Sequence, residues 1–230
     1  MPLSNVQPDH YDAILSTKIA SVLEKFRALN APRPEVFSSP AQGFRLRAEF
    51  RLWHEGDDLN YVMFRSDDRK TPVVIGDFPI ACNAIQTLMP ALLDGLKASH
   101  VLRHKIFQTE FLCTLSGDML VTLIYHRTLG DDWHNEAALL ATELNVQLIG
   151  RSRKQKRVVG RDWVDECLTI DGREYHYRQP EQAFTQPNGH VNQRMISWAL
   201  KYARPLGGDL LELYCGIGNF TLPLAQAFNN

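Results

Sequence analysis

The sequence has few cysteines, no dominant charge and no long apolar run. Its cysteines lie far apart and form no C-x-x-C pair; they are Cys82, Cys113, Cys167 and Cys215. This spacing predicts neither a zinc site nor an iron–sulfur cluster. Because the apolar runs are interrupted within a few residues, the sequence predicts no membrane span and a cytoplasmic location.

The charge balance excludes a global field that would attract nucleic acid. The net charge is −1 and the pI about 6.7. A local basic face can still contact phosphates. The most basic stretch, residues 151–157, fits that role, and it fits an ordinary exposed hairpin equally well. At 230 residues the chain has room for one large domain or two modest ones.

The N-terminal part predicts a helix followed by an antiparallel sheet. Apolar residues recur every three or four positions from Tyr11 to Phe26, which indicates a helix with Asp9 as its cap. Strict alternation over Phe44–Leu52 indicates a strand with one apolar face. Further elements are expected as strands at 59–65, 73–77, 105–115 and 119–126 and as a helix at 80–96.

The next stretch predicts a helix that is capped by Asp131 or Asp132 and runs to Leu144. A strand at 146–151 follows, and two short strands at 163–170 and 174–178 are joined by an Asp171–Gly172 turn.

The pattern changes near Pro180. A helix is expected at 188–203, a buried strand at 209–214 and another helix at 220–228, with a glycine turn between the last two. A strand, a glycine turn and a helix in that order are typical of the first βα unit of a doubly wound sheet.

The glycine turn, Cys215–Asn219, indicates a bound ligand of a particular charge. A dinucleotide site would need a third glycine where Thr221 stands, so a nicotinamide oxidoreductase is disfavoured. Glu212 just before the turn favours a cationic sulfonium with an amino-acid tail instead. A lone G-x-G is a weak signal, and a plain βα turn without a ligand is the alternative.

Two blocks in a fixed order give a more specific signal. Phe184–Asn188 precedes Asp209–Phe220, and together they strongly resemble the tRNA uracil-C5 methyltransferases. Residues 45–51, 102–108 and 148–151 are similar to that family too, so the resemblance covers essentially the whole chain. It implies an α+β RNA-binding domain with an antiparallel sheet over residues 1–180. The start of a Rossmann-like α/β methyltransferase domain would follow over residues 181–230.

The resemblance also implies a cofactor, S-adenosyl-L-methionine, and the residues that contact it. Gln186, Tyr214 and Asn219 match cofactor-contacting positions, and Gly216 would shape the loop beneath the methionine part, together with Gly218. Taken alone, Gln186 would be a residue at the entry of a helix, ahead of Pro187.

The implied partner is the T-arm of tRNA, in which the T-loop uridine becomes 5-methyluridine. Phe107 matches a position that stacks within the rearranged loop, whereas its spacing alone favours a core residue. Arg47 and Arg51, with Arg45, lie on the exposed face of their strand and are expected to contact RNA; a solvated face is the alternative. His126 is a further candidate of lower weight.

The chemistry of the family adds a cysteine thiolate to C6 of uracil, so that C5 attacks the methyl group and a base then removes the C5 proton. The resemblance places the nucleophile and the base beyond residue 230, so no catalytic residue is expected within residues 1–230. We therefore expect an N-terminal fragment, inactive alone, of an enzyme that binds no metal and is a monomer at full length. Two alternatives stay open: an RNA-binding module without catalysis, and a uracil-C5 methyltransferase for rRNA or another structured RNA. Related rRNA enzymes typically carry a four-cysteine cluster, and its absence favours tRNA.

Overall fold

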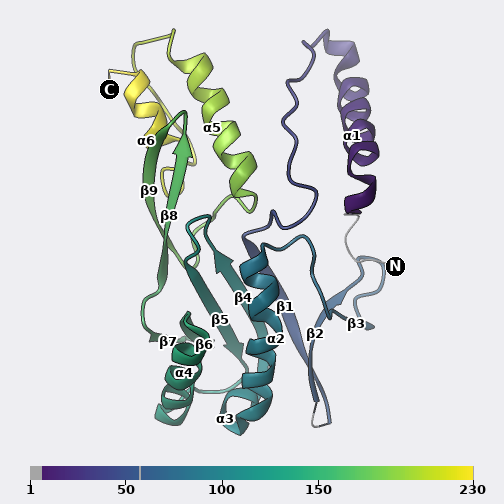
Figure 1. The fold of residues 1–230 in the computed structure, drawn as a ribbon, viewed down its shortest axis with the longest axis vertical. Coiled ribbons are helices and arrows are strands. Elements are labelled where there is room, and N and C mark those ends of the chain that lie inside the picture. Colours follow the sequence, from purple (N-terminus) through teal and green to yellow (C-terminus); the bar gives the residue numbers. More distant parts are fainter. Residues whose placement is uncertain (1–6, 57, 230) are drawn as a thin grey trace.

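A seven-stranded sheet dominates the computed structural model, which describes residues 7–56 and 58–229 (Figure 1). The strand order is β3-β2-β1-β4-β5-β6-β7. The strands are β1 (Arg47–Glu55), β2 (Asp58–Phe64), β3 (Pro72–Val74), β4 (Ile106–Cys113), β5 (Met119–Tyr125), β6 (Gln147–Ser152) and β7 (Gln155–Val159). Each strand expected in this part of the sequence is present, with ends that shift by a few residues.

The expected antiparallel sheet is wrong at one pair of strands. β5 and β6 run parallel, with Leu120 opposite Gln147, while the other neighbouring pairs are antiparallel. Parallel strands need a long crossover, and helix α4 (Asp131–Leu144) provides it. The sheet is therefore mixed.

The main core lies between the sheet and helices α2 (Asn83–Ala98), α3 (His100–Arg103) and α4 (Figure 1). The alternation read from β1 holds, because Ala48, Phe50 and Leu52 are buried while the side chains between them are exposed. Trp133 of α4 is completely buried and lies over Gly150 of β6, where a Cβ atom would come within 2.4 Å of the indole. The crossover helix is thus packed directly onto the strand that it precedes.

A second, smaller core joins a hairpin to the C-terminal helices. The hairpin consists of β8 (Trp163–Ile170) and β9 (Arg173–Pro180). It packs on α5 (Gly189–Ala203) and α6 (Thr221–Leu224) through Leu168, Ile170, Tyr175, Tyr177, Ile196 and Leu200. The predicted boundary after residue 180 stays a prediction, and this core lies across it.

The tight turn of the hairpin forms as expected. Asp171 and Gly172 have φ angles of 50° and 79°, the positive pair that a two-residue hairpin turn requires.

The expected buried strand at 209–214 is wrong. The segment is irregular, and Leu211 and Leu213 are 83% and 72% exposed. An extended segment becomes a strand only when a neighbour takes up its backbone hydrogen bonds, and no strand of the described chain lies beside this one. The expected helix at 220–228 is likewise reduced to α6 and a 3-10 turn at Ala225–Ala227.

Two expected helix caps are also wrong. A short 3-10 helix, Pro8–His10, places His10 rather than Asp9 at the start of α1 (Tyr11–Phe26), and Gly130 precedes α4, so that Asp131 and Asp132 lie inside its first turn. Helix α1 forms as predicted, and a 3-10 turn (Arg27–Leu29) follows it, but none of its residues is buried. In the described part of the chain, no helix has the length and apolar character needed to cross a membrane.

Candidate functional site

A cavity of about 120 Å³ lies among the hairpin β8–β9, helix α5 and the glycine turn. All four residues predicted to contact the cofactor line it: Gln186, Tyr214, Gly216 and Asn219. The two sequence blocks, about two dozen residues apart, therefore meet at one place. Its other polar and charged lining residues are Glu166, Gln179, Thr185, Asn192 and Glu212.

The block at residues 184–188 is held against the start of β1. The Leu46 N–H donates to the carbonyl of Pro187 at 2.7 Å, and the Asn188 side chain donates to Ser39 Oγ at 2.6 Å. Asn188 also caps α5 by accepting from the Val191 N–H at 3.0 Å. These bonds fix where Gln186 enters the cavity.

Arg47 takes part in this anchoring. Its guanidinium donates to the carbonyls of Ala183, at 2.9 Å, and Glu181, at 3.4 Å, and lies 3.7 Å from the Glu110 carboxylate. Its contact with RNA stays a prediction, and the structure gives it protein partners. Arg45 is similar, because it donates to the Arg47 carbonyl at 2.7 Å.

The glycine turn and the residue just before it, Tyr214, contain left-handed backbone. Gly216 and Gly218 have φ angles of 58° and 81°, which glycine adopts without strain. Tyr214 has a φ of 59°, an uncommon conformation for a bulky residue, and its side chain is fully exposed. Strained positions of this kind concentrate at ligand sites. The predicted glycine turn is therefore present, although the strand before it is absent.

Two carboxylates give the cavity a negative lining. Glu212 accepts a hydrogen bond from the Thr221 hydroxyl. Glu166, which sequence reasoning missed, is buried and accepts the backbone N–H groups of Leu115 and Cys167, each at 3.0 Å. Burial raises the pKa of Glu166 above its ordinary value, and the N–H groups oppose that rise. The place of Glu166 on the buried face of β8, between Val164 and Leu168, is a signal of burial but not of a cavity.

Neither thiol that lines the cavity has a basic residue beside it in the lining. Cys113 is buried, and its hydrogen bond with Cys82, together with burial, raises its pKa, so it is a neutral thiol. Cys215 lies on the exposed turn. Among the described residues that line the cavity there is no histidine, lysine or arginine. The predicted absence of a catalytic residue within the chain is consistent with this geometry and stays a prediction.

A second candidate surface lies at the far end of β4. The Arg51 guanidinium lies 3.9 Å from the centre of the Phe107 ring, and the ring of His126 lies 4.2 Å from it. These three residues line a depression of about 570 Å³ together with Trp53, His54 and Lys105. Phe107 is half-buried here and does not belong to the core, so the structure brings together three residues expected to contact RNA.

The basic stretch 151–157 forms the hairpin of β6 and β7. Arg151 makes two 2.6 Å hydrogen bonds to the carboxylate of Glu181, Lys156 lies 2.7 Å from Asp162, and Arg157 lies 2.9 Å from Asp131. These acidic partners favour the structural hairpin over a phosphate clamp.

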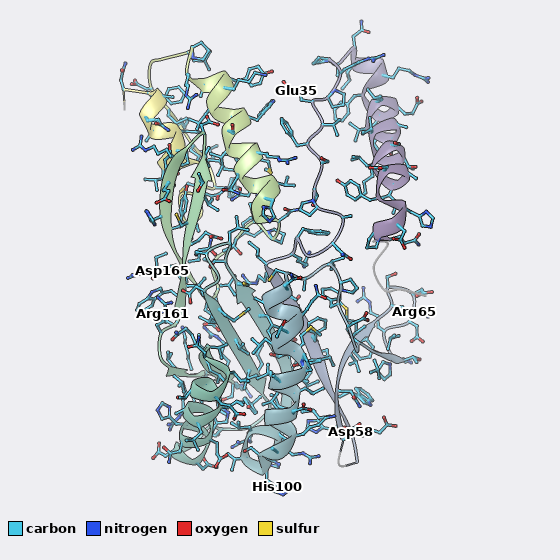
Figure 2. The ribbon with its side chains drawn as sticks, viewed as in Figure 1. Glu35, Asp58, Arg65, His100, Arg161 and Asp165 are labelled. Carbon is cyan, nitrogen blue, oxygen red and sulfur yellow. The ribbon has the colours of Figure 1, made fainter. Side chains whose placement is uncertain are left out.

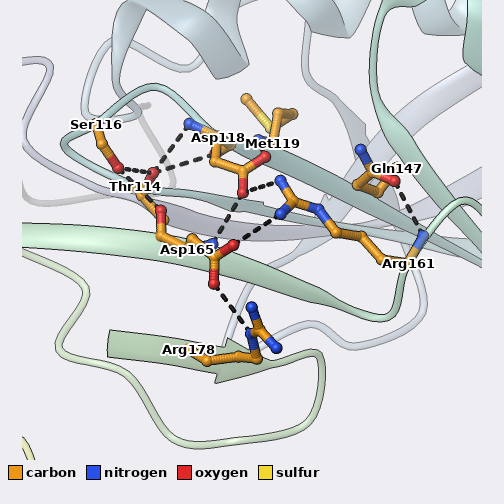
Figure 3. Close-up of polar contacts among 8 residues, drawn as sticks. All are labelled: Thr114, Ser116, Asp118, Met119, Gln147, Arg161, Asp165 and Arg178. Carbon is orange, nitrogen blue, oxygen red and sulfur yellow. Dashed lines mark hydrogen bonds and ion pairs between the residues drawn. The ribbon is translucent and has the colours of Figure 1, made fainter. Parts of the chain in front are cut away.

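A polar network joins the β8–β9 hairpin to the large sheet. Arg161 binds the carboxylates of Asp118 and Asp165, the Asp165 N–H donates to Asp118 at 2.8 Å, and Ser116 donates to the Asp165 carbonyl at 2.9 Å (Figure 3). Figure 2 places Arg161 and Asp165 where the hairpin passes the sheet. The network holds β8, and with it Glu166 at the cavity, against the large sheet.

One cluster on the hairpin has metal-ligand chemistry. Donor atoms of Cys167, Glu174 and His176 lie within 4.8 Å of one another, and of these residues Glu174 and His176 are exposed. Exposed side chains of this kind are common without an ion. The expectation of no metal stays a prediction.

Comparison with known proteins gives a consistent family. A family profile described as tRNA (Uracil-5-)-methyltransferase matches residues 10–230. A Pseudomonas fluorescens protein described as tRNA/tmRNA (uracil-C(5))-methyltransferase is 54% identical over 215 residues, which are 94% of this chain and 59% of the relative. A protein of the same description from Aromatoleum aromaticum is 50% identical over 229 residues, 100% of this chain and 62% of the relative. The chain thus spans about three fifths of the length of these relatives.

A solved structure shares the fold. The crystal structure of a Pyrococcus abyssi tRNA (uracil-54, C5)-methyltransferase in complex with S-adenosyl-L-homocysteine matches with a TM-score of 0.68 at 16% identity. The match covers 94% of this chain and 54% of that one. At this identity the likeness concerns the fold alone.

Proposed function

Because the chain belongs to the tRNA (uracil-5-)-methyltransferase family, we propose that it forms the cofactor-binding and RNA-contacting parts of an enzyme that methylates C5 of the T-loop uridine in tRNA. The observation that carries this proposal is the cavity in which Gln186, Tyr214, Gly216 and Asn219 meet. Residues from two separate sequence blocks would have no reason to converge on one cavity if the glycine turn were a plain connection.

The lining of the cavity fits S-adenosyl-L-methionine by its chemistry. The bound cofactor supplies an electrophilic methyl group on a sulfonium sulfur. The amides of Gln186 and Asn219 both donate and accept, which suits the amino and carboxylate groups of the methionine part. Glu212 and Glu166 add negative charge next to a cation. The Pyrococcus protein, which has the same fold, was crystallised with S-adenosyl-L-homocysteine, the product of such a transfer.

The surface around Phe107 suits an unstacked RNA loop. A base that is to be modified must leave its stack, and aromatic and guanidinium faces take up exposed bases. Phe107 lies six residues from Cys113 along β4, about 20 Å at the rise of an extended strand. The proposed stacking surface is therefore well separated from the cofactor cavity, and an RNA hairpin that touches both must lie along β4.

We propose the chemistry that the family resemblance implies. A cysteine thiolate adds to C6, C5 attacks the methyl group, a base takes the C5 proton, and the cysteine is eliminated. We place neither the thiolate nor the base in residues 1–230. Cys113 is neutral and buried, and Cys215 has no basic residue beside it in the cavity.

The test has a binding part and a transfer part. Isothermal titration of this chain with S-adenosyl-L-homocysteine is expected to show binding that Gln186→Ala weakens about tenfold. Methyl transfer from labelled S-adenosyl-L-methionine to a T-arm hairpin is expected from a protein extended to the length of the curated relatives, and to vanish when the T-loop uridine is replaced by cytidine. RNA binding without cofactor binding or transfer would favour the alternative of an RNA-binding module. Transfer to an rRNA hairpin but not to the T-arm would overturn the tRNA assignment.

A further inference from the structure

Asn192 is a buried polar residue of helix α5 that lies outside both sequence blocks. Its side chain is 5% exposed, and it lines the same cavity as Gln186 and Asn219. The spacing of the helix places Asn192 on its buried face, four residues before Ile196, but does not show that it reaches a cavity. Its position at the cavity calls for a physical reason, because burying an amide costs free energy unless its hydrogen bonds are made.

Asn192 makes a reciprocal pair of hydrogen bonds with Asn219. Nδ2 of each residue donates to Oδ1 of the other, both at 2.8 Å. Turning only one of the two amides would oppose two oxygens and two NH₂ groups, so the orientation of Asn192 dictates that of Asn219. Asn192 is anchored in a helix, whereas Asn219 lies on an irregular turn. The helix residue is therefore the one that sets the orientation.

The backbone of Asn219 is held from the other side. The Tyr177 hydroxyl of β9 donates to the Asn219 carbonyl at 3.1 Å. Helix α5 also carries the anchored end of the first block, because Asn188 is its cap and accepts from the Asn192 N–H at 2.9 Å. One turn of helix thus links the place where Gln186 enters the cavity to the side chain that fixes Asn219.

We propose that Asn192 is a positioning residue of the cofactor site, whose carboxamide holds Asn219 in the orientation that binds the amino-acid part of S-adenosyl-L-methionine. The inference rests on the proposed function. The pair uses one N–H and one oxygen lone pair of each amide, so each residue retains a donor and an acceptor for a ligand. A turn that carries Asn219 without its partner would have to order that side chain during binding, which lowers affinity.

The experiment is calorimetric titration of the chain and its variants with S-adenosyl-L-homocysteine. Asn192→Leu, of similar size, removes both bonds and is expected to weaken binding about tenfold. Asn192→Asp still accepts a hydrogen bond from Asn219, and its affinity is expected to lie between that of the parent and that of Asn192→Leu. Because the residues act as one unit, Asn192→Leu combined with Asn219→Leu should weaken binding no more than Asn219→Leu alone.

Gln193→Leu is the matched control. It also removes an amide of α5 and one hydrogen bond, from the Thr169 N–H at 2.8 Å, but it does not line the cavity, so its affinity should equal that of the parent. Parental affinity in folded Asn192→Leu, or losses that add in the double variant, would overturn the inference while leaving the cofactor site intact. If Asn192→Leu does not fold by circular dichroism, Asn192→Asp decides, and parental affinity there overturns the inference. A parent chain that binds no S-adenosyl-L-homocysteine would contradict the proposed cofactor site itself, and the inference with it.

Discussion

Leu123 and Leu211 carry the same side chain in two regions of the molecule, and they differ in how far that side chain is buried. Leu123 lies in the middle of β5 and is completely buried, whereas Leu211 precedes the glycine turn and is 83% exposed. Both belong to apolar runs that predict a strand. Strand β5 is paired with β4 on one side and β6 on the other, and Leu123 packs in the core that also contains α2 and α4. The run at 209–214 has no neighbouring strand in the described chain. An apolar pattern therefore tells which residues can be buried, and the partner decides whether they are.

The largest effect is expected at Glu181, which follows β9 and connects the smaller C-terminal part of the molecule to the large sheet. Glu181, 3% exposed, accepts two bonds from Arg151 and one from Thr122 at 3.0 Å, and lies 3.2 Å from Lys156. Glu181→Ala leaves these donors without their acceptor and is expected to lower the free energy of unfolding by about 3–5 kcal/mol, measured by urea denaturation. Glu174→Ala, at an exposed position on the β8–β9 hairpin that Glu181 follows, should change it by less than about 0.5 kcal/mol.

The pH dependence of that effect has a definite sign. Burial raises the pKa of Glu181. The hydrogen bonds from Arg151, Lys156 and Thr122 lower it by more, so the pKa lies below its ordinary value. Its stabilisation is therefore present above the unfolded pKa and is lost as the pH falls through the folded one. Glu166 has a raised pKa and the opposite sign, because protonation favours the folded state. An acid titration of stability that is unchanged by Glu181→Gln would contradict this assignment.

The two leucines test the comparison directly. Leu123→Ala should lower the free energy of unfolding by about 2–5 kcal/mol, through lost burial and the cavity left behind. Leu211→Ala should change it by less than about 0.5 kcal/mol, because little of that side chain leaves water on folding. Both values come from the same urea titration. A loss above about 2 kcal/mol at Leu211, in the range of a buried leucine, would mean that the segment is buried in solution, and the contrast between the regions would fail.

Phe107 lies on the large sheet, but its substitution should affect RNA affinity more than stability. Phe107→Ala is expected to weaken the affinity for a T-arm hairpin about tenfold, the effect of one lost base–aromatic stack. The urea midpoint should fall only slightly, because the ring is half-buried. Fluorescence anisotropy with a labelled hairpin measures the affinity. Phe37→Ala, an exposed phenylalanine elsewhere, serves as the control and should bind like the parent.

The smallest expected change in the free energy of unfolding concerns the Asp171–Gly172 turn of the β8–β9 hairpin. Gly172 has a φ of 79° with open space around its missing Cβ, so Gly172→Ala should cost about 1 kcal/mol through backbone strain alone. Gly76 has open space too but no positive φ, and Gly76→Ala should be neutral or stabilise by up to about 1 kcal/mol. Thermal unfolding of the pair resolves the difference, and equal melting temperatures would show that strain at the turn is negligible.

The sequence predicted local strands and turns better than the way in which these elements pair with one another. Alternation located β1, and the Asp171–Gly172 pair located the hairpin, because both signals lie within a few residues. The parallel pairing of β5 and β6 depends on a crossover helix, which no single strand reveals. The caps failed for a local reason, since a preceding 3-10 turn and Gly130 occupy the starts of α1 and α4.

The candidate site divides in the same way. Gln186, Tyr214, Gly216 and Asn219 could be predicted because they lie in recognisable blocks, and they line one cavity; their contact with a cofactor stays a prediction. Glu166 and Asn192 reach that cavity through tertiary packing, from a strand and a helix whose spacing shows only burial. Arg47 and Arg51 lie on the same face of one strand and look equivalent in the sequence. Only their neighbours, the carbonyl of Ala183 for the first and the ring of Phe107 for the second, tell them apart.

The hydrogen bond between the Leu46 N–H and the Pro187 carbonyl joins residues far apart in the chain. A contact of such high sequence separation closes a large loop, and contacts of this kind form late because the entropy of closure must be met first. Within the large sheet, the pairs β1–β2, β2–β3, β4–β5 and β6–β7 join strands that follow one another in the chain and can form early. The block around Gln186 can settle only after β1 is in place. On this order of events the ligand cavity is among the last parts of the molecule to mature, and the amide of Leu46 is a natural reporter of that step in pulsed hydrogen exchange.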